Sequence, residues 1–278
     1  SCLAVLHSVH QTMRVTLQKK GSISSWQIIH SSSISIQWKR ISMLFTPSLR
    51  SFFDSRVPSS CLLCHGAVRG LKPLCSGCEQ DLPWNACACL RCAIPMHTAG
   101  YFCGECLQAP PVFQHALCAF RYEEPVAGLL NRYKHSGKLA CGHWLAQGLA
   151  DAIARHYEKG QMALPDCVMP VPLHWRRLRS RGFDQGGEIG KVLARRLALP
   201  VSSALRRQRY TSSQQALNRE QRQRNLAGAF ALQAPLPYRS VALVDDVLTT
   251  GSTAHEITAL LQSGGVEEVH IWAIARTP

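Results

Sequence analysis

The sequence predicts an α/β protein, a parallel sheet covered by helices, preceded by a double zinc ribbon. Three observations support this fold class. Short apolar runs alternate with amphipathic stretches after residue 110, as they do in α/β sheets. Cysteine pairs crowd residues 61–106 at spacings typical of zinc sites. An acidic pair and a hydroxyl-rich turn also follow one apolar run, and open α/β folds bind ligands at strand ends.

The chain has 278 residues, a formal charge of +14 and a sequence pI of about 9.5. This balance indicates a polyanionic partner, which could be a nucleic acid, a phosphorylated small molecule or an anionic surface. No apolar run approaches the ~18 residues of a membrane-spanning helix. Residues 1–42 also lack the apolar region and cleavage site of a secretory signal. We therefore expect a cytoplasmic protein with no membrane span.

Residues 1–57 differ from the rest of the chain. They are rich in serine, carry several basic residues before the first acid, Asp54, and show no sustained helical or strand period. The sequence begins with serine, and Met43 stands shortly before the first cysteine pair. We expect this leader to be disordered or non-native, with the natural protein beginning near Met43. A basic binding arm is the alternative.

Residues 58–110 contain an internal repeat. The pattern Cys-x2-Cys-x10-Cys-x2-Cys begins at Cys61 and recurs 28 positions later at Cys89. Because so few large apolar residues cannot build much of a core, we expect two structural zinc ions, each held by four thiolates. Disulfides and a redox-active pair are the alternatives, and the zinc ligands could be sequential or interleaved between the halves. The predicted ligands are Cys61, Cys64, Cys75, Cys78, Cys89, Cys92, Cys103 and Cys106.

Two further expectations concern this module. Its aromatic residues Trp84, Tyr101 and Phe102 could stack on nucleic acid bases, but we expect them to fill the small core of the module. Chelation of zinc is expected to unfold residues 58–108 and to leave the following domain folded.

Residues 111–278 are predicted to form that second domain, because strands and helices alternate along them. Strands are expected at residues 112–122, 166–170, 230–232, 241–244 and 269–275. Helices are expected at residues 125–134, 139–157, 186–197, 213–226 and 254–263. No glycine-rich dinucleotide fingerprint and no Walker sequence occurs, which argues against a dinucleotide or ATP as the main ligand.

A polar site is expected after the strand at residues 241–244. Asp245 and Asp246 follow that strand, and a turn rich in hydroxyls surrounds Gly251 just before a helix. Unpaired backbone N–H groups at a helix start favour a phosphate. Carboxylates accept hydrogen bonds from vicinal hydroxyls, directly or through Mg²⁺. A ribose 5-phosphate satisfies both halves of the site, although an ordinary turn with a helix cap is the alternative.

The stretch at residues 241–253, VALVDDVLTTGST, resembles the phosphoribosyl pyrophosphate (PRPP) motif of type I phosphoribosyltransferases. The resemblance implies a phosphoribosyltransferase-like parallel sheet. It also implies that Asp245 and Asp246 hold the ribose hydroxyls as catalytic residues. The 5-phosphate would be held by Thr249, Thr250, Gly251, Ser252 and Thr253.

A second polar segment follows the strand at residues 166–170. Two prolines preset a short loop, and four arginines, whose guanidinium groups suit phosphate, follow within residues 176–181. Residues 181–185, Arg-Gly-Phe-Asp-Gln, resemble a signature of the ComF family, in which asparagine is more usual at Asp184. In phosphoribosyltransferases this loop grips pyrophosphate, which implies that Pro172, Arg176 and Arg181 contact PRPP. A solvated arginine face is the alternative.

Residues 206–225 resemble the flap of the same family, which closes over pyrophosphate. The resemblance implies a catalytic role for Arg209 and PRPP contacts for Gln214 and Arg222. A charged surface helix is the alternative for residues 214–224. Tyr133 and Lys134 match a short lysine motif of ComF proteins.

The resemblance to ComF and GntX-like proteins covers residues 58–278, and these proteins are associated with DNA uptake and the use of external DNA in bacteria. It implies a phosphoribosyltransferase that takes PRPP with Mg²⁺, in contact with single-stranded DNA or other DNA-uptake proteins. The competing hypothesis is a non-enzymatic protein that binds single-stranded DNA and keeps the PRPP fold for binding or sensing. The sequence leaves the acceptor substrate, the occurrence of turnover and the oligomeric state open.

Overall fold

The computed structural model describes residues 58–69, 72–98, 101–136, 138–210 and 226–278. The predicted leader at residues 1–57 therefore lies outside the described residues. So do Gln214 and Arg222 of the flap, together with nearly all of the helix predicted at residues 213–226.

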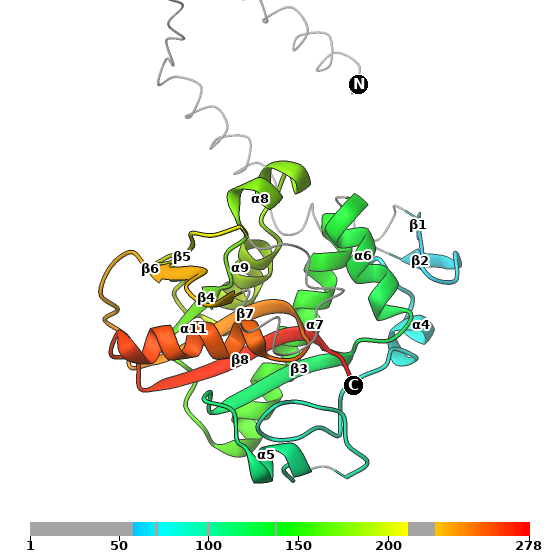
Figure 1. The fold of residues 1–278 in the computed structure, drawn as a ribbon. Coiled ribbons are helices and arrows are strands. Elements are labelled where there is room, and N and C mark those ends of the chain that lie inside the picture. The colour runs from blue at the N-terminus through cyan, green and yellow to red at the C-terminus, as the bar shows by residue number, and fades with distance from the viewer. Residues whose placement is uncertain (1–57, 70–71, 99–100, 137, 211–225) are drawn as a thin grey trace, which may run out of the picture. The chain divides into compact units, whose positions relative to one another are not determined.

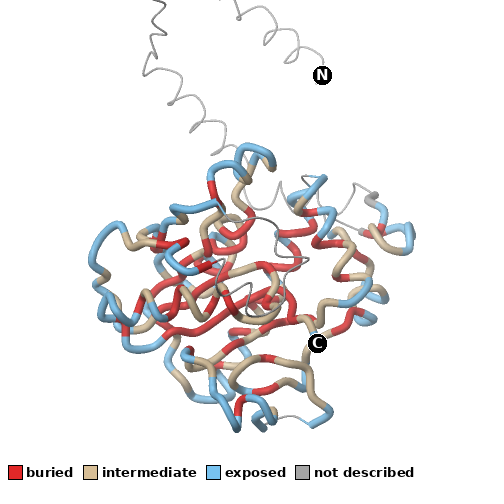
Figure 2. Tube along the Cα trace, in the orientation of Figure 1, coloured by how far each residue is buried: buried red, intermediate tan, exposed pale blue. Residues whose placement is uncertain are grey.

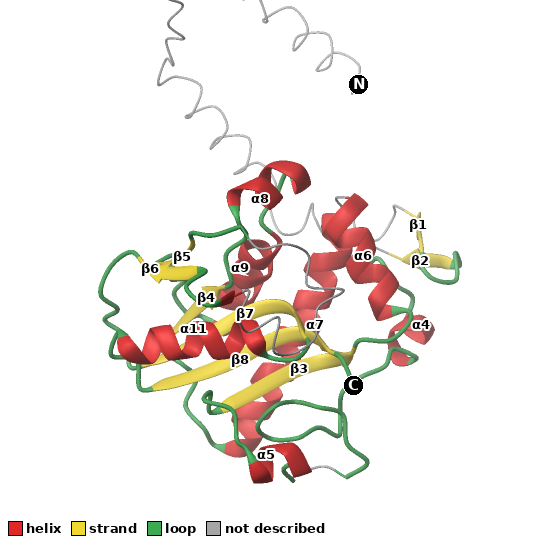
Figure 3. Ribbon diagram, in the orientation of Figure 1, coloured by secondary structure: helices red, strands yellow, loops and turns green. Residues whose placement is uncertain are grey.

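A four-stranded parallel sheet forms the centre of the described chain (Figure 3). Its strand order is β3-β8-β7-β4, so β7 has one neighbour on each side. The strands are β3 (His115–Arg121), β4 (Cys167–Pro170), β7 (Ser240–Leu248) and β8 (Glu268–Arg276). A continuous apolar run, residues 241–244, fills the buried start of β7, as expected for a strand covered on both faces. The predicted α/β class with a parallel sheet is confirmed.

Helices cover both faces of this sheet (Figure 1). One face packs against α6 (Val126–Ser136), α7 (Leu139–Gly160) and α9 (Gln185–Leu197), and the other packs against α11 (Ser252–Ser263). α7 can lie flat on the sheet because Leu145, Leu149 and Ile153 recur at helical spacing and are fully buried. In the described residues no helix combines the length and the apolar composition needed to cross a membrane.

The sheet and the helices that cover it carry most of the buried residues (Figure 2). The alternation of side chains along β7 divides these buried residues into two clusters. Ala242 and Val244 belong to a first core, which contains the buried side chains of α6, α7 and α9. Val241 and Leu243 belong to a second core, which contains the buried side chains of α11. Because successive residues of a strand point to opposite faces, each core lies on its own side of the sheet.

The cysteine-rich module adds short elements that join these cores. β1 (Pro58–Ser60) and β2 (Ala67–Arg69) form an antiparallel pair, and two one-turn helices follow at α4 (Ser76–Gln80) and α5 (Gly104–Gln108). Val68, Leu74 and Leu82 lie in the first core, whereas Ala93 lies in the second. The indole of Trp84 packs against Phe120, with ring centroids 4.4 Å apart. The module is therefore packed onto the sheet.

Three features differ from the sequence predictions. β7 runs on to Leu248, so the acidic pair lies within the strand and not after its end. The arginine-rich segment after β4 forms a helix, α8 (Trp175–Arg181), which went unpredicted because it buries no residue and has no apolar period. β5 (Leu205–Arg207) was also missed, and it pairs antiparallel with β6 (Phe230–Leu232) from far along the chain.

The expectation for the aromatic residues of the module was wrong in part. Trp84 is half-buried against the first core, as expected. Tyr101 and Phe102 are 63% and 44% exposed, so they do not fill a core. The guanidinium of Arg91 lies 5.8 Å from the ring centroid of Phe102.

Candidate functional site

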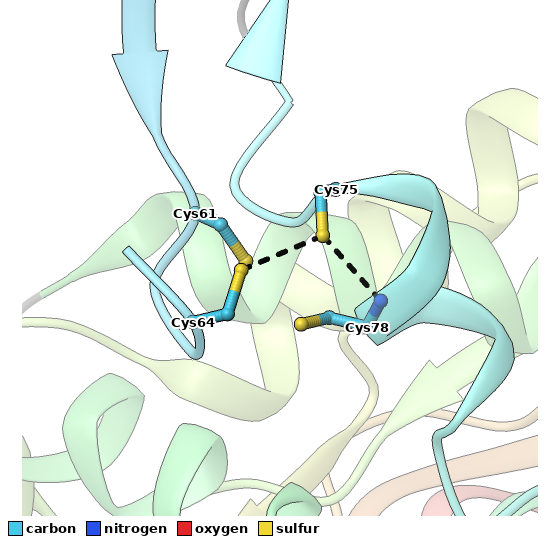
Figure 4. A group of neighbouring side chains, drawn as sticks. All are labelled: Cys61, Cys64, Cys75 and Cys78. Carbon is cyan, nitrogen blue, oxygen red and sulfur yellow. Dashed lines mark hydrogen bonds between the residues drawn. The ribbon is translucent and has the colours of Figure 1, made fainter. Parts of the chain in front are cut away.

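The eight predicted zinc ligands form two separate groups of four. Within each group the sulfur atoms all lie within 4.8 Å of one another, and each group takes its members from one half of the repeat. In Figure 4 the four side chains of the first group point toward a common centre. Sγ of Cys64 lies 3.7 Å from Sγ of Cys75, close to the ~3.8 Å edge of a tetrahedron with zinc–sulfur bonds of about 2.3 Å. The groups therefore fit structural zinc, with sequential ligands and no disulfide.

The two halves of the repeat share one backbone geometry. In the first half, His65 N donates to Cys61 O at 3.0 Å, and in the second half Ala93 N donates to Cys89 O at 3.0 Å. His65 and Ala93 both have positive φ angles, +60° and +56°, in the left-handed region. A tight turn directs the first two thiolates of each set toward the metal position.

Asp246 lies within a network of polar side chains on the first-core face of β7. Its Oδ1 lies 3.1 Å from Lys134 Nζ of α6, and both side chains are largely buried. Its Oδ2 accepts a hydrogen bond from Gln185 Nε2, and Arg181 donates to the oxygen of that amide. Tyr133 Oη donates to the backbone carbonyl of Gln185 at 3.0 Å. Residues of α6, α8 and α9 are thereby joined to the centre of the sheet.

Asp245 points toward the opposite face, as alternation along the strand requires. Burial, together with the neighbouring charge of Asp246, raises the pKa of Asp245 to about 7. Arg207 of β5 is the nearby arginine on this face, and its own pKa is lowered by burial and by the charge of Arg177. One carboxylate is thus paired with a lysine, while its neighbour takes up a proton near neutral pH.

The hydroxyl-rich turn lies between β7 and α11. Gly251 adopts φ +75°, which only glycine adopts readily, and α11 begins at the next residue. The hydroxyls of Thr250 and Ser252 lie 2.9 Å apart, and Ser252 is buried. Thr249 and Thr253 are half-buried. Thr249, Thr250 and Gly251 also line a cavity of about 400 Å³, so the turn is open to a space that can hold a ligand.

Arg176 and Arg177 of α8 lie against a group of aromatic rings. Cζ of Arg176 lies 5.4 Å from the ring centroid of Trp175 and 5.4 Å from that of Tyr210. Trp175 and Tyr210 are 54% and 46% exposed, and the ring of the buried His174 contacts both. Burial and the nearby Arg176 lower the pKa of His174. Pro172 is half-buried in the loop that leads into this helix.

The structure brings together most of the predicted site residues, but not all of them. Arg209 is exposed, and its guanidinium donates to the carbonyl of Ala227 at 2.8 Å. The charge of Arg207 acts on Asp245, and the sequence did not single out this arginine because it lies in the unpredicted strand β5. Gln185 belongs to the motif at residues 181–185. Its contact with Asp246 could not be predicted from the sequence, because the two residues are 61 positions apart.

Two protein families match the chain. The double zinc ribbon domain matches residues 52–119, and the phosphoribosyl transferase domain matches residues 184–278. Competence protein F of Haemophilus influenzae is 34% identical over 233 residues, which cover 82% of this chain and all of that protein. DNA utilization protein YhgH of Escherichia coli is 34% identical over 223 residues, which cover 80% of this chain and 98% of that protein. A solved structure of the allosteric regulatory enzyme of purine biosynthesis aligns with 47% of this chain and 25% of its own, at 21% identity and a TM-score of 0.30.

Proposed function

Because the chain belongs to the ComF family, with a double zinc ribbon and a phosphoribosyltransferase-like domain, we propose that it binds PRPP with Mg²⁺ and transfers its phosphoribosyl group. The observation that carries the proposal is the arrangement along β7. Two carboxylates stand near the end of the central strand, and a hydroxyl turn at a helix start follows them directly. In this proposal the carboxylates hold the ribose hydroxyls and the turn holds the 5-phosphate.

Positive charge near the carboxylates supports the position of the pyrophosphate. Lys134 contacts Asp246, and the charge of Arg207 acts on Asp245. Arg176 and Arg181 lie on α8, which follows the strand beside β7. These side chains can stabilise the negative charge that grows on departing pyrophosphate. Arg209, Gln214 and Arg222 remain proposed contacts of a closing flap.

The residues present also fit Mg²⁺. Carboxylate oxygens are ligands that this ion prefers, and Asp245 and Asp246 offer them beside the proposed pyrophosphate position. When bound, the ion would neutralise charge on the pyrophosphate. The protein residues would position the sugar and limit the access of water, since Asp246 is only 7% exposed and Asp245 is half-buried.

Calorimetric titration of PRPP with and without Mg²⁺ tests this proposal. Changing Asp245 and Asp246 together to asparagine should weaken Mg²⁺-dependent binding at least about 10-fold, because hydrogen bonds to charged groups contribute most at such sites. Asp151→Asn is the matched control, because Asp151 forms an exposed ion pair with Arg196 on the surface of α7 and α9. Equal PRPP affinity in the double variant and the wild type would contradict the proposal. Pyrophosphate release on addition of an acceptor would establish transfer.

A second candidate function is favoured by the exposed rings beside α8. Trp175 and Tyr210 flank the guanidinium of Arg176, and stacking aromatics with arginines are characteristic of proteins that bind single-stranded nucleic acid. The net charge of +14 agrees with neutralisation of a phosphate backbone. In this alternative the chain is a non-enzymatic accessory protein for DNA uptake or use, and the PRPP site serves binding or sensing.

Fluorescence anisotropy with a thymidine oligonucleotide at several salt concentrations separates the two functions. Replacing Arg176 and Arg179 with alanine should weaken DNA binding and reduce its salt dependence, whereas the double asparagine variant at the acidic pair should leave it unchanged. Arg239→Ala is the control, because Arg239 is exposed just before β7, at the other end of the strand. An equal loss of DNA binding in Arg239→Ala would show that binding depends on net positive charge alone and not on the arginines of α8.

A further inference from the structure

The halves of the cysteine repeat are the first ribbon, residues 61–78, and the second ribbon, residues 89–106. The second ribbon forms one wall of a cavity at the hydroxyl-rich turn of residues 249–253, which is the proposed phosphate turn. This cavity, of about 400 Å³, extends from Ile94 and Glu105 of the second ribbon to Thr250 of the turn and His255 of α11. Its size falls in the range of sites for small ligands, which are mostly apolar with a few polar groups. The half-buried Ile94 and the buried Phe113 supply apolar surface, and Glu105 supplies a carboxylate.

Direct contacts fasten the two walls to each other. Arg276, at the end of β8, donates from Nε to the carbonyl of Cys92 at 3.0 Å and from Nη1 to the carbonyl of Leu248 at 3.3 Å. The ring of Phe113 meets that of His255 edge to face, with centroids 5.5 Å apart. These contacts hold the wall of the cavity together. They join the turn at Cys92, the end of β7 and the start of α11.

The order of the strands places this cavity opposite the arginines of α8. α8 follows β4, which lies on one side of β7, and β8 lies on the other side (Figure 1). The cavity is lined by Arg276, at the end of β8. A sugar held above β7 thus has arginines on one flank and the second ribbon on the other. Displacement at C1 requires the incoming and departing groups to align on opposite sides of the carbon.

We infer that the cavity holds the acceptor of the transfer reaction, a nitrogen heterocycle the size of a nucleobase, so that the second ribbon is part of the active site. This inference rests on the proposed phosphoribosyl transfer. A ring nitrogen donates its lone pair to C1 of the sugar, and the bond from C1 to the pyrophosphate oxygen breaks. The electron pair of that bond leaves with pyrophosphate, and the proton of the ring nitrogen passes to water at the exposed rim near Glu105.

The experiment compares ligands that occupy one or both halves of the site. Ribose 5-phosphate and the 5′-monophosphates of adenosine, guanosine, uridine, cytidine, inosine and orotidine are titrated calorimetrically into the zinc-loaded full chain. We expect at least one nucleotide to bind about 10-fold more tightly than ribose 5-phosphate, because its base enters the cavity.

Ala109→Trp provides the test of place, because Ala109 lies at the exposed rim and lines the cavity. The variant should remove the advantage of the nucleotide and leave the affinity for ribose 5-phosphate within about twofold. Gln108→Trp is the matched control: this neighbouring residue is exposed and lies outside the cavity lining, so both affinities should persist.

Each contrary outcome has a distinct meaning. If ribose 5-phosphate binds but no base adds affinity, or if Ala109→Trp keeps the nucleotide advantage, the acceptor assignment is overturned and the PRPP site stands. If Ala109→Trp abolishes binding of ribose 5-phosphate as well, the cavity holds phosphate and the assignment also fails. If neither ribose 5-phosphate nor PRPP with Mg²⁺ binds the wild type, the proposed function fails and the inference falls with it.

Discussion

The two faces of the central strand meet different parts of the molecule. Ala242, Val244 and Asp246 face α6, α7 and α9 together with the first ribbon, whereas Val241 and Asp245 face α11 and the β5–β6 pair. The first core holds large buried side chains contributed by the first ribbon. The second core takes only a small alanine, Ala93, from the second ribbon.

The two halves of the cysteine repeat have identical spacing but differ in how much they contribute to the core, so we assign them different roles. The first ribbon buries Leu74 and Leu82 with the helices, so its zinc site supports the fold of the whole sheet. The second ribbon leaves Tyr101 and Leu107 exposed and lies beside the phosphate turn, so its zinc site shapes a surface near the ligand. Equal cysteine patterns therefore do not imply equal contributions to stability.

The largest expected effect separates the two zinc sites. Cys61 and Cys89 hold equivalent places in the repeat and are both buried, yet only the first belongs to the first core. Cys61→Ser should destabilise the whole chain on the order of 5 kcal/mol, because zinc binding and folding are coupled there. Cys89→Ser should leave the main unfolding transition within about 1 kcal/mol. Urea unfolding followed by far-UV circular dichroism, with zinc content measured in parallel, checks this.

Equal loss of stability in the two cysteine variants would erase the distinction between the ribbons. A loss of stability of the whole chain would also contradict the sequence-based expectation that chelation of zinc unfolds residues 58–108 alone. Because Val68, Leu74 and Leu82 share a core with Phe120, we now expect chelation to weaken the sheet as well.

A leucine pair tests the same contrast without touching the metal. Leu74 of the first ribbon is 1% exposed, and Leu90 of the second is 37% exposed. Leu74→Ala should cost about 2–5 kcal/mol of unfolding free energy, as buried truncations do, whereas Leu90→Ala should cost less than about 1 kcal/mol. Chemical denaturation measures both, and a larger cost at Leu90 would show that the second ribbon packs more tightly than its exposure suggests.

The sequence predicted the chemistry of the site better than its geometry. Residues 241–253 and the cysteine repeat were recognisable because their types and spacing follow directly from strand, turn and metal chemistry. The helix at Trp175–Arg181 was not recognisable, because an arginine-rich helix on the surface has no apolar period. The contact of Lys134 with Asp246 joins distant positions, and tertiary packing alone determines it.

The two aspartates provide a pH test of the two faces. The pKa of Asp245 is raised from 3.8 to about 7 in the folded chain, so protonation favours the folded state. The associated stability is fully present below pH 4 and is lost as the pH rises through 7. Asp245→Asn stays neutral, so its stability relative to the wild type should increase between pH 5 and pH 8, by no more than about 3 kcal/mol. A constant difference across that range, measured by denaturation, would show that water solvates the carboxylate.

The smallest effect expected concerns the two glycines at the ends of α11, both on the second-core face. Gly251 and Gly265 have φ angles of +75° and +94°, and a Cβ at either one meets no atom closer than 3.7 Å. Alanine should therefore cost each site about 1–2 kcal/mol through backbone strain alone. Only Gly251 lies at the phosphate turn, so Gly251→Ala should also weaken ribose 5-phosphate binding, whereas Gly265→Ala should not. Calorimetry would contradict this if both variants bound the ligand equally, because the turn would then tolerate a change of backbone shape that a phosphate cradle cannot.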